Sequence, residues 1–190
     1  ETVRKYLQDP EFLFFLGNTD PKKNTPGTLK AYAEYVRRSE KPLPLLVADL
    51  GEQPAEAILR EIGEPRLRGM LRLAGYIPNS DLPAIYNEAS AFLYTSLRES
   101  FGIPQLEAMA CGTPVVTSAA SAIPEVAGQG AILVDPTDPT AIADALLRLE
   151  TDAEFRAGQV AYGLERVKQF SWEKTARHLL ALYESLGKTN

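Results

Sequence analysis

Residues 91–118 read AFLYTSLRESFGIPQLEAMACGTPVVTS, and this stretch decides the fold. Two short apolar runs, 91–96 and 114–118, enclose a segment with helical spacing at 104–110. Both runs are apolar on both faces, as expected of strands in a parallel sheet that helices cover from both sides. The stretch therefore predicts a strand–helix–strand unit.

The same alternation continues in both directions along the chain. Four more apolar runs of similar length, bounded by residues typical of turns, lie at 12–17, 44–50, 70–76 and 131–134. Segments with helical spacing lie between or after these runs, at 28–38, 55–62, 80–88, 140–149, 153–170 and 172–186. We predict an α/β fold, a Rossmann-like doubly wound parallel sheet of about six strands with helices on both faces.

Composition limits the class of protein. The 190 residues favour a single domain over 1–190. The chain has 20 Lys and Arg against 25 Asp and Glu, a net charge of −5, which argues against a nucleic-acid binder. One cysteine excludes an internal disulfide and a cysteine-based zinc site, and no apolar run is long enough to span a membrane. The single cysteine and the lack of a charged-then-apolar leader predict a cytoplasmic protein. Because no initiator Met opens the chain, we expect it to be a piece of a longer protein.

The terminal segment 171–190 predicts a helix with a broad apolar face. Because amphipathic helices usually bury their apolar stripe locally, packing on the chain's own sheet is the favoured interpretation. Part of the face remains available to a domain outside this sequence. The apolar positions are Trp172, Ala176, Leu179, Leu180, Leu182, Tyr183 and Leu186.

The loop after the first predicted strand, residues 17–24, is a candidate ligand loop because doubly wound sheets bind ligands at the carboxyl ends of their strands. It contains neither a Walker phosphate loop nor the dinucleotide-binding glycine fingerprint. Gly17 allows close backbone approach, and Lys22 and Lys23 enter a helix. The spacing alone favours a solvated turn over a phosphate contact.

The loop after 91–96 carries a second set of candidates. Gly102 frees the backbone and Pro104 suits a first helical turn, whose N–H groups form an anion site. Two carboxylates, Glu99 and Glu107, flank this turn. Glu107 lies among apolar neighbours in the sequence, so we expect it to be poorly hydrated and to need hydrogen-bond donors. The vicinal hydroxyls of a sugar and a structural arginine or backbone group are equally good candidates.

Residues 99–104 and 107–116 together resemble the Glu-x7-Glu region of retaining GT-B glycosyltransferases of family four. Residues 17–23 resemble the family's glycine–lysine phosphate loop, 75–78 with Leu82 its base-recognition turn, and 170–172 the start of its terminal helix. The resemblance runs from about residue 12 to 186. It implies the C-terminal, donor-binding half of a two-domain enzyme.

The resemblance also implies roles for single residues. Lys23 would neutralise the departing diphosphate, and Glu99 would contact hydroxyls of the transferred sugar, so these two form the implied catalytic pair. Glu107 would hold the ribose hydroxyls, and Ile77 would meet the base through its backbone. The other implied donor-binding residues are Gly17, Asn18, Lys22, Ser100, Phe101, Gly102 and Ile103.

The implied reaction transfers a hexose with retention of configuration from a nucleotide-sugar such as UDP-, GDP- or ADP-hexose, with no metal and no further cofactor. The acceptor, a saccharide or lipid-linked glycan, would bind the absent N-terminal domain, which would also make any contact with the inner face of the membrane. We therefore expect the isolated chain to be inactive.

One position departs from the family pattern. Asn18 stands where the family usually has an arginine that pairs with the diphosphate, and asparagine brings no charge. Lys22, Arg98 or the absent half could replace that charge. Ser100 in place of glycine is a milder change. Two alternatives therefore stay open, a non-catalytic binding or scaffolding domain, and a phosphorylase or sugar-phosphate synthase on the same fold.

Overall fold

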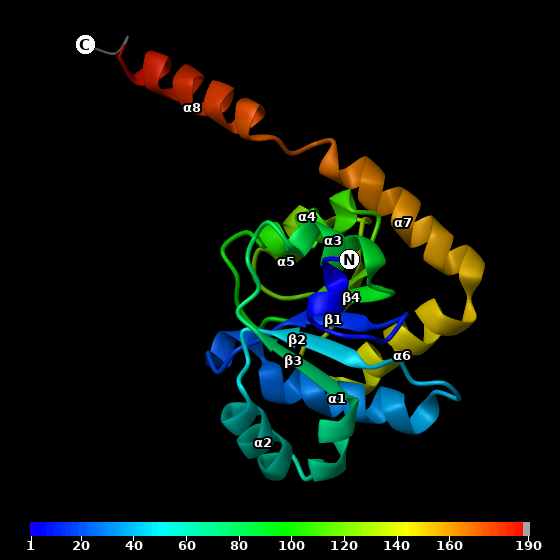
Figure 1. Ribbon diagram of the computed structural model, residues 1–190. Helices are drawn as coiled ribbons and strands as arrows, with labels where there is room; N and C mark the ends of the chain where they lie inside the picture. Colours follow the sequence, from blue (N-terminus) through cyan, green and yellow to red (C-terminus); the bar gives the residue numbers. More distant parts are fainter. Residues whose placement is uncertain (188–190) are drawn as a thin grey trace.

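The computed structural model describes residues 1–187 and contains one six-stranded sheet in which every neighbouring pair of strands is parallel (Figure 1). The strand order is β3-β2-β1-β4-β5-β6. Strands β2 and β3 therefore lie on one side of β1, and β4 to β6 lie on its other side. This confirms the predicted doubly wound sheet. The strands are β1 (Leu13–Leu16), β2 (Leu45–Ala48), β3 (Leu71–Gly75), β4 (Ala91–Tyr94), β5 (Val115–Ser118) and β6 (Ile132–Val134).

Helices cover both faces of the sheet. One face carries α1 (Thr25–Arg38), α2 (Glu52–Glu61) and α6 (Pro139–Thr151) (Figure 1). The other face carries α3 (Leu82–Glu88), α4 (Ile103–Ala110) and α5 (Ile123–Ala127). The helix α7 (Ala153–Val167) packs against both α4 and α6 and so joins the two layers.

Alternating side chains along the strands build two separate hydrophobic cores. In β1, Leu13 and Phe15 face the core under α1 and α6, whereas Phe14 faces the core under α3 and α4. This is the two-residue period of a strand applied to a sheet that is buried on both sides. Every apolar run that we predicted as a strand contains one.

The short elements were not predicted. They are α5 and the 3₁₀ helices η1 (Val3–Lys5), η2 (Pro21–Lys23) and η3 (Pro65–Met70). None is long enough to show a helical period in the sequence. The predicted helix at 28–38 begins earlier, at Thr25, because Asn24 takes a left-handed conformation (φ 57°) that ends η2 and starts α1.

The expectation that the last helix packs on its own sheet is wrong. The helix α8 (Trp172–Gly187) extends away from the body of the molecule (Figure 1). Trp172 is 80% exposed and Tyr183 is 66% exposed. Both faces of the sheet are already covered by the preceding helices, so no free sheet surface remains for α8. Within residues 1–187, no helix has the length and apolar character that crossing a membrane requires.

Candidate functional site

The loops after β1 and β4 meet at the point where the strand order reverses, which is where such sheets bind ligands. Besides the Lys23–Glu99 pair described below, three hydrogen bonds join the first of these loops and the start of α1 to the end of β4 and the loop that follows it. The Leu97 amide donates to the Lys22 carbonyl at 2.7 Å, Asn24 Nδ2 donates to the Thr95 carbonyl at 3.1 Å, and the hydroxyls of Thr28 and Thr95 lie 2.5 Å apart. Residues far apart in the sequence are thus held side by side.

The two implied catalytic residues form an ion pair across these loops. Lys23 Nζ lies 2.7 Å from Glu99 Oε1, and the two side chains are 20% and 15% exposed. Burial acts to raise the pKa of Glu99, but hydrogen bonds from Lys23, Ser96 and Tyr94 and the Lys23 charge outweigh it and lower the pKa. Glu99 is therefore a carboxylate at neutral pH.

Tyr94, at the end of β4, packs against this ion pair. Its side chain is buried, and its ring centroid lies 5.5 Å from Lys23 Nζ, within cation–π range. Burial first, and then the nearby Glu99 carboxylate, raise the pKa of the Tyr94 phenol. The phenol therefore stays protonated and can only donate to Glu99.

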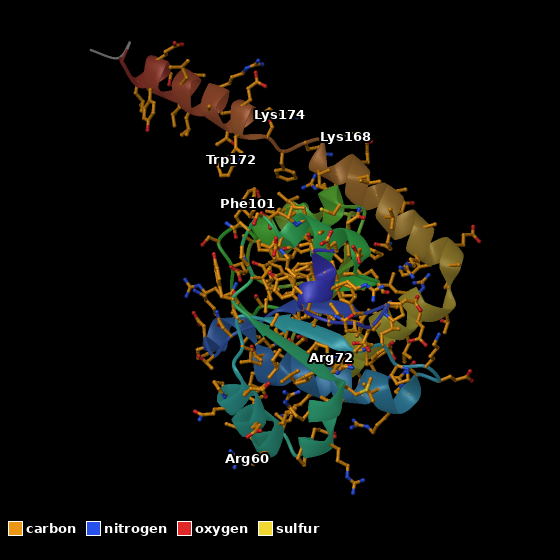
Figure 2. All side chains as sticks on the ribbon, in the orientation of Figure 1. Arg60, Arg72, Phe101, Lys168, Trp172 and Lys174 are labelled. Atoms are coloured by element: carbon orange, nitrogen blue, oxygen red, sulfur yellow. The ribbon has the colours of Figure 1, made fainter. Side chains whose placement is uncertain are left out.

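The loop from Glu99 to α4 presents backbone N–H groups to the site. Gly102, with φ at +92°, precedes α4, and within residues 1–187 no side chain is hydrogen-bonded to the free N–H groups of the first helical turn. The Ser121 hydroxyl donates to the Glu99 carbonyl at 2.7 Å and accepts from the Glu99 amide at 3.3 Å, which fixes the start of the loop. Phe101, labelled in Figure 2, is 42% exposed. Its ring packs edge-on against that of Phe170, with the ring centroids 5.8 Å apart. Here α4 offers donors for an anion.

Glu107 is exposed, which corrects the expectation that it lies in apolar surroundings. Its apolar neighbours Ala108 and Met109 face the core, and the helical period turns Glu107 outward. Its Oε2 accepts a hydrogen bond from the Tyr86 hydroxyl at 3.3 Å. Burial and the Glu107 charge raise the pKa of Tyr86, so that phenol also acts as a donor. Glu107 remains open to further donors from a ligand.

The turn after β3 carries the last of the predicted site residues, Ile77, so the predicted residues form a row along this edge of the sheet. Ile77 is buried and Tyr76 is 75% exposed. Three strand spacings of about 4.8 Å separate β3 from β4, so the row from this turn to Glu99 is roughly 14 Å long. The arrangement fits an elongated ligand along the sheet edge, with Ile77 near one end and Glu99 near the other.

The remaining residues of the first loop shape its backbone. A Cβ on Gly17 would lie 2.0 Å from Cε1 of Phe15, so packing against the preceding strand already requires glycine there. Asn18 Oδ1 accepts from the Asp20 amide at 2.9 Å. Lys22 Nζ lies 3.1 Å from Asp20 Oδ2. Of the four predicted site residues in this loop, Gly17, Asn18, Lys22 and Lys23, only Lys23 has a side-chain contact with the loop after β4 among residues 1–187.

A model of the family described as glycosyl transferases group 1 matches residues 3–166. The chain belongs to this family. An O-antigen chain mannosyltransferase B from Escherichia coli is 34% identical over 175 residues, 92% of this chain and 46% of that protein. A D-inositol 3-phosphate glycosyltransferase from Frankia alni is 33% identical over 186 residues, 93% of this chain and 46% of that protein. The chain thus spans about half the length of these relatives.

Solved structures agree with this assignment. Sucrose-phosphate synthase from Thermosynechococcus elongatus superposes with a TM-score of 0.80 at 26% identity, over 99% of this chain and 48% of that chain. The C-terminal domain of a group 1 glycosyltransferase from Francisella tularensis, at 22% identity, has the same fold. Its TM-score is 0.74, with 87% of this chain and 88% of that chain covered. This group 1 domain has the size and fold of the C-terminal half of a GT-B glycosyltransferase.

Sequence reasoning missed four side chains that support the site of this group 1 domain. Tyr94 and Ser96 contribute hydrogen bonds to Glu99, Ser121 holds the Glu99 backbone, and Tyr86 donates to Glu107. The signal for Tyr94 and Ser96 was their place at the end of a buried strand. Tyr86 and Ser121 carried no such signal, because only the tertiary structure brings them to the site.

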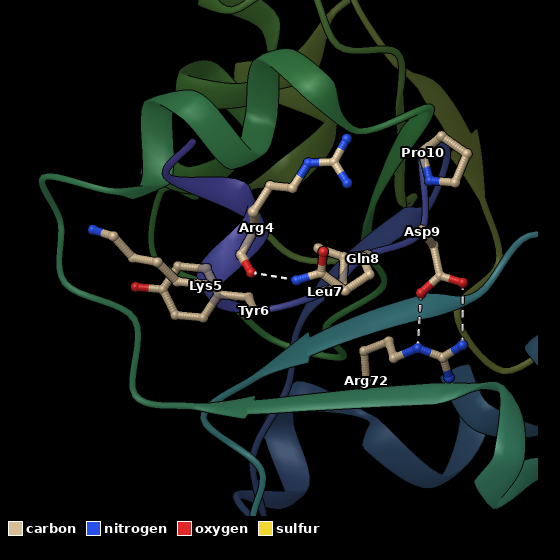
Figure 3. Close-up of a pocket in the computed structure, with 8 residues that line it drawn as sticks. All are labelled: Arg4, Lys5, Tyr6, Leu7, Gln8, Asp9, Pro10 and Arg72. Carbon is tan, nitrogen blue, oxygen red and sulfur yellow. Dashed lines mark hydrogen bonds and ion pairs between the residues drawn. The ribbon is translucent and has the colours of Figure 1, made fainter.

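A second concave region lies at the N-terminal segment, away from these loops. It is lined by residues 4–10 and Arg72, and Arg72 forms a two-pronged pair with Asp9 at 2.9 and 3.2 Å (Figure 3). This pair fastens the segment before β1 to the edge strand β3, which is a structural role. Among residues 1–187, no cluster of three or more His, Cys, Asp or Glu side chains is arranged to hold a metal.

Proposed function

We propose that this group 1 glycosyltransferase domain binds the nucleotide-sugar donor of a retaining hexosyltransferase that requires no metal. The observation that supports the proposal is the 2.7 Å pair of Lys23 and Glu99, held beside the uncapped start of α4 where the strand order reverses. One cation and a row of N–H groups next to a carboxylate suit a ligand that carries both phosphate and sugar hydroxyls.

The donor would lie along the sheet edge. Its base would meet the backbone at Ile77, its ribose diol would donate to Glu107, and its diphosphate would lie between Lys23 and the start of α4. The hexose would then reach Glu99, whose lowered pKa keeps it an acceptor for sugar hydroxyls. Ile77 follows β3, whereas Lys23 and Glu99 follow the neighbouring strands β1 and β4, so the base and the hexose would lie toward opposite ends of this edge.

In the proposed reaction, the bond between the anomeric carbon and the diphosphate oxygen breaks, and its electron pair leaves with the nucleoside diphosphate. The acceptor oxygen forms the new bond on the same face and loses its proton to the departing phosphate. Lys23 stabilises the negative charge that develops on that phosphate. Because Glu99 pairs with Lys23 in the free domain, donor binding replaces this ion pair with Lys23–phosphate and Glu99–hydroxyl contacts.

The acceptor side would lie in the part of the protein outside this sequence. The chain covers 46% of the mannosyltransferase and 46% of the inositol-phosphate glycosyltransferase relatives. We propose that the acceptor is a saccharide or lipid-linked glycan and that the uncovered apolar face of α8 packs toward that missing part. The isolated chain would then bind donor without transferring sugar.

Calorimetric titration with UDP, GDP and ADP tests this function. We expect one nucleotide to bind and Glu107→Gln to weaken it about tenfold, because a charge-assisted hydrogen bond to the ribose becomes a neutral one. Glu61→Gln, an exposed glutamate at the end of α2, is the matched control and should bind like the wild type. Equal binding by the Glu107→Gln and wild-type proteins would contradict the assigned ribose site.

Asn18 supports a second candidate, a non-catalytic nucleotide-sugar-binding domain. Its side-chain oxygen accepts from the Asp20 amide, and the side chain brings no charge to the diphosphate. Asn18→Arg in the full-length protein separates the two functions. A large gain in transfer from little or no activity would favour the non-catalytic domain, whereas an unchanged and substantial rate would favour the enzyme.

A further inference from the structure

We propose that Lys22, Arg98 and Ser100 form a second anion subsite, next to the Lys23–Glu99 pair, that takes a phosphate group. The proposal deepens the function proposed above and rests on it for the source of that phosphate. The subsite is a cavity of about 560 Å³ lined by Lys22, Arg98, Glu99, Ser100 and Ser121.

The charges around the cavity favour an anion. Lys23 neutralises Glu99, and Asp20 lies 3.1 Å from Lys22 in a pair that is about half exposed. Arg98 has no hydrogen bond, ion pair or ring contact with any residue in 1–187. One uncompensated positive charge therefore lines the cavity of a chain whose net charge is −5.

The chemistry of the lining favours phosphate among anions. The planar guanidinium of Arg98 presents parallel N–H donors that match two phosphate oxygens. Lys22 adds a point charge, and Ser100 adds a hydroxyl at the position where the resemblance expects glycine. None of these three side chains is buried, so a ligand can reach all of them.

Ser121 makes the wall of this cavity rigid. Its backbone lies in the left-handed region, with φ at +60°, a conformation that costs energy for a residue other than glycine. Its hydroxyl makes both hydrogen bonds to the Glu99 backbone, so the strained turn holds the start of the loop that carries Arg98 and Ser100. The fold thus fixes the backbone at Glu99, between Arg98 and Ser100.

Two sources could supply the phosphate, the diphosphate of the donor or a phosphate group on the acceptor. The first would replace the arginine charge that is missing at Asn18. The second would make the acceptor a sugar phosphate or a similar phosphorylated compound. Both share the same chemistry, and competition distinguishes them.

Titration of the ¹⁵N-labelled chain with inorganic phosphate, followed by NMR at constant ionic strength set with sodium chloride, tests the subsite. We expect saturable shifts of the Arg98 side chain and of the Ser100 and Ser121 amides. Arg98→Gln should weaken binding about tenfold, as expected for the loss of a charge-assisted bidentate contact. Arg66→Gln, an exposed arginine on η3 that is likewise without a partner in residues 1–187, is the control. Unchanged phosphate affinity in Arg98→Gln, or shifts elsewhere only, would overturn the proposal.

Repeating the phosphate titration with the chain saturated by the nucleoside diphosphate that binds it identifies the source. Loss of the phosphate shifts would assign the subsite to the donor diphosphate, and their persistence would assign it to a phosphate on the acceptor. If no nucleotide binds but phosphate binding still depends on Arg98, the subsite stands and the donor function fails. If nucleotide binding depends on Glu107 while phosphate binding does not depend on Arg98, the donor function stands and the subsite fails.

Discussion

Replacing Lys23 tests whether the ion pair with Glu99 is an organising feature of the site. At the observed 2.7 Å separation, the attraction between two unit charges is about 6 kcal/mol at an effective dielectric of 20. Desolvation of both groups offsets most of this, because their side chains are only 20% and 15% exposed. A hydrogen bond between charged groups contributes about 1.5–3 kcal/mol net, so we expect a coupling of about 2 kcal/mol.

The assay is a double-mutant cycle with Lys23→Met, Glu99→Gln and the double variant. Urea unfolding at pH 7 gives the free energy of unfolding of all four proteins, and the cycle isolates the pairwise coupling. The exposed pair of Lys168 and Glu165, with Nζ and Oε2 2.6 Å apart and side chains 69% and 71% exposed, is the matched control. A coupling at Lys23 and Glu99 no larger than the coupling of this control pair would refute the reasoning.

We also expect the effect of Lys23→Met on the free energy of unfolding to depend on pH. The pKa of Glu99 is lowered in the folded domain, so the stabilisation is present above the ordinary glutamate pKa of about 4.3 and is lost as the pH falls through the folded value. In Lys23→Met, the hydrogen bond and charge of Lys23 no longer oppose the effect of burial. The pKa of Glu99 in the folded variant is therefore higher than in the folded wild type. The difference in unfolding free energy between wild type and Lys23→Met should therefore shrink between pH 7 and about pH 3. If this difference in unfolding free energy stays constant across the range, the loss in Lys23→Met comes from lost side-chain packing and not from the ion pair.

Two further predictions concern stability. Gly102→Ala should lower the free energy of unfolding by about 1–3 kcal/mol, because φ is +92° and the new Cβ would lie 2.8 Å from Gln105 Nε2. In urea unfolding it should cost more than Gly63→Ala, whose φ is +77° with open space around it, and equal losses would rule out the contact with Gln105. Ending the chain after Phe170 should change the thermal midpoint by less than about 3 °C in a calorimetric scan, because the side chains of residues 171–186 are exposed. A larger fall would show that α8 packs on the domain.

The strands were predictable because their burial is visible in the sequence. A short run that is apolar at consecutive positions and bounded by turn residues is typical of a strand in a sheet covered on both faces, and all six runs contain a strand. The start of α6 was also predictable, because its signal lies in neighbouring residues. Asp138 before Pro139 predicts a helix start, and the Asp138 carboxylate indeed accepts from the Thr140 and Ala141 amides.

The environment of single side chains was less predictable. Apolar neighbours in sequence suggested that Glu107 is poorly hydrated, but the 3.6-residue period turns it outward while Ala108 and Met109 face the core. The apolar stripe of α8 has the pattern of a packed helix and nevertheless lies uncovered. A pattern shows that a face can be buried, whereas the available surface decides whether it is.

The sequence by itself determined the alternation of strands and helices, the doubly wound class and the motif that carries the family resemblance, since all of these depend on residues close together in the chain. Only the tertiary structure decided that Lys23 meets Glu99, 76 positions away, with Tyr94 beneath them and Ser121 fixing the loop. The physical reason is the strand order. It places β1 beside β4, and no local pattern records which strands become neighbours.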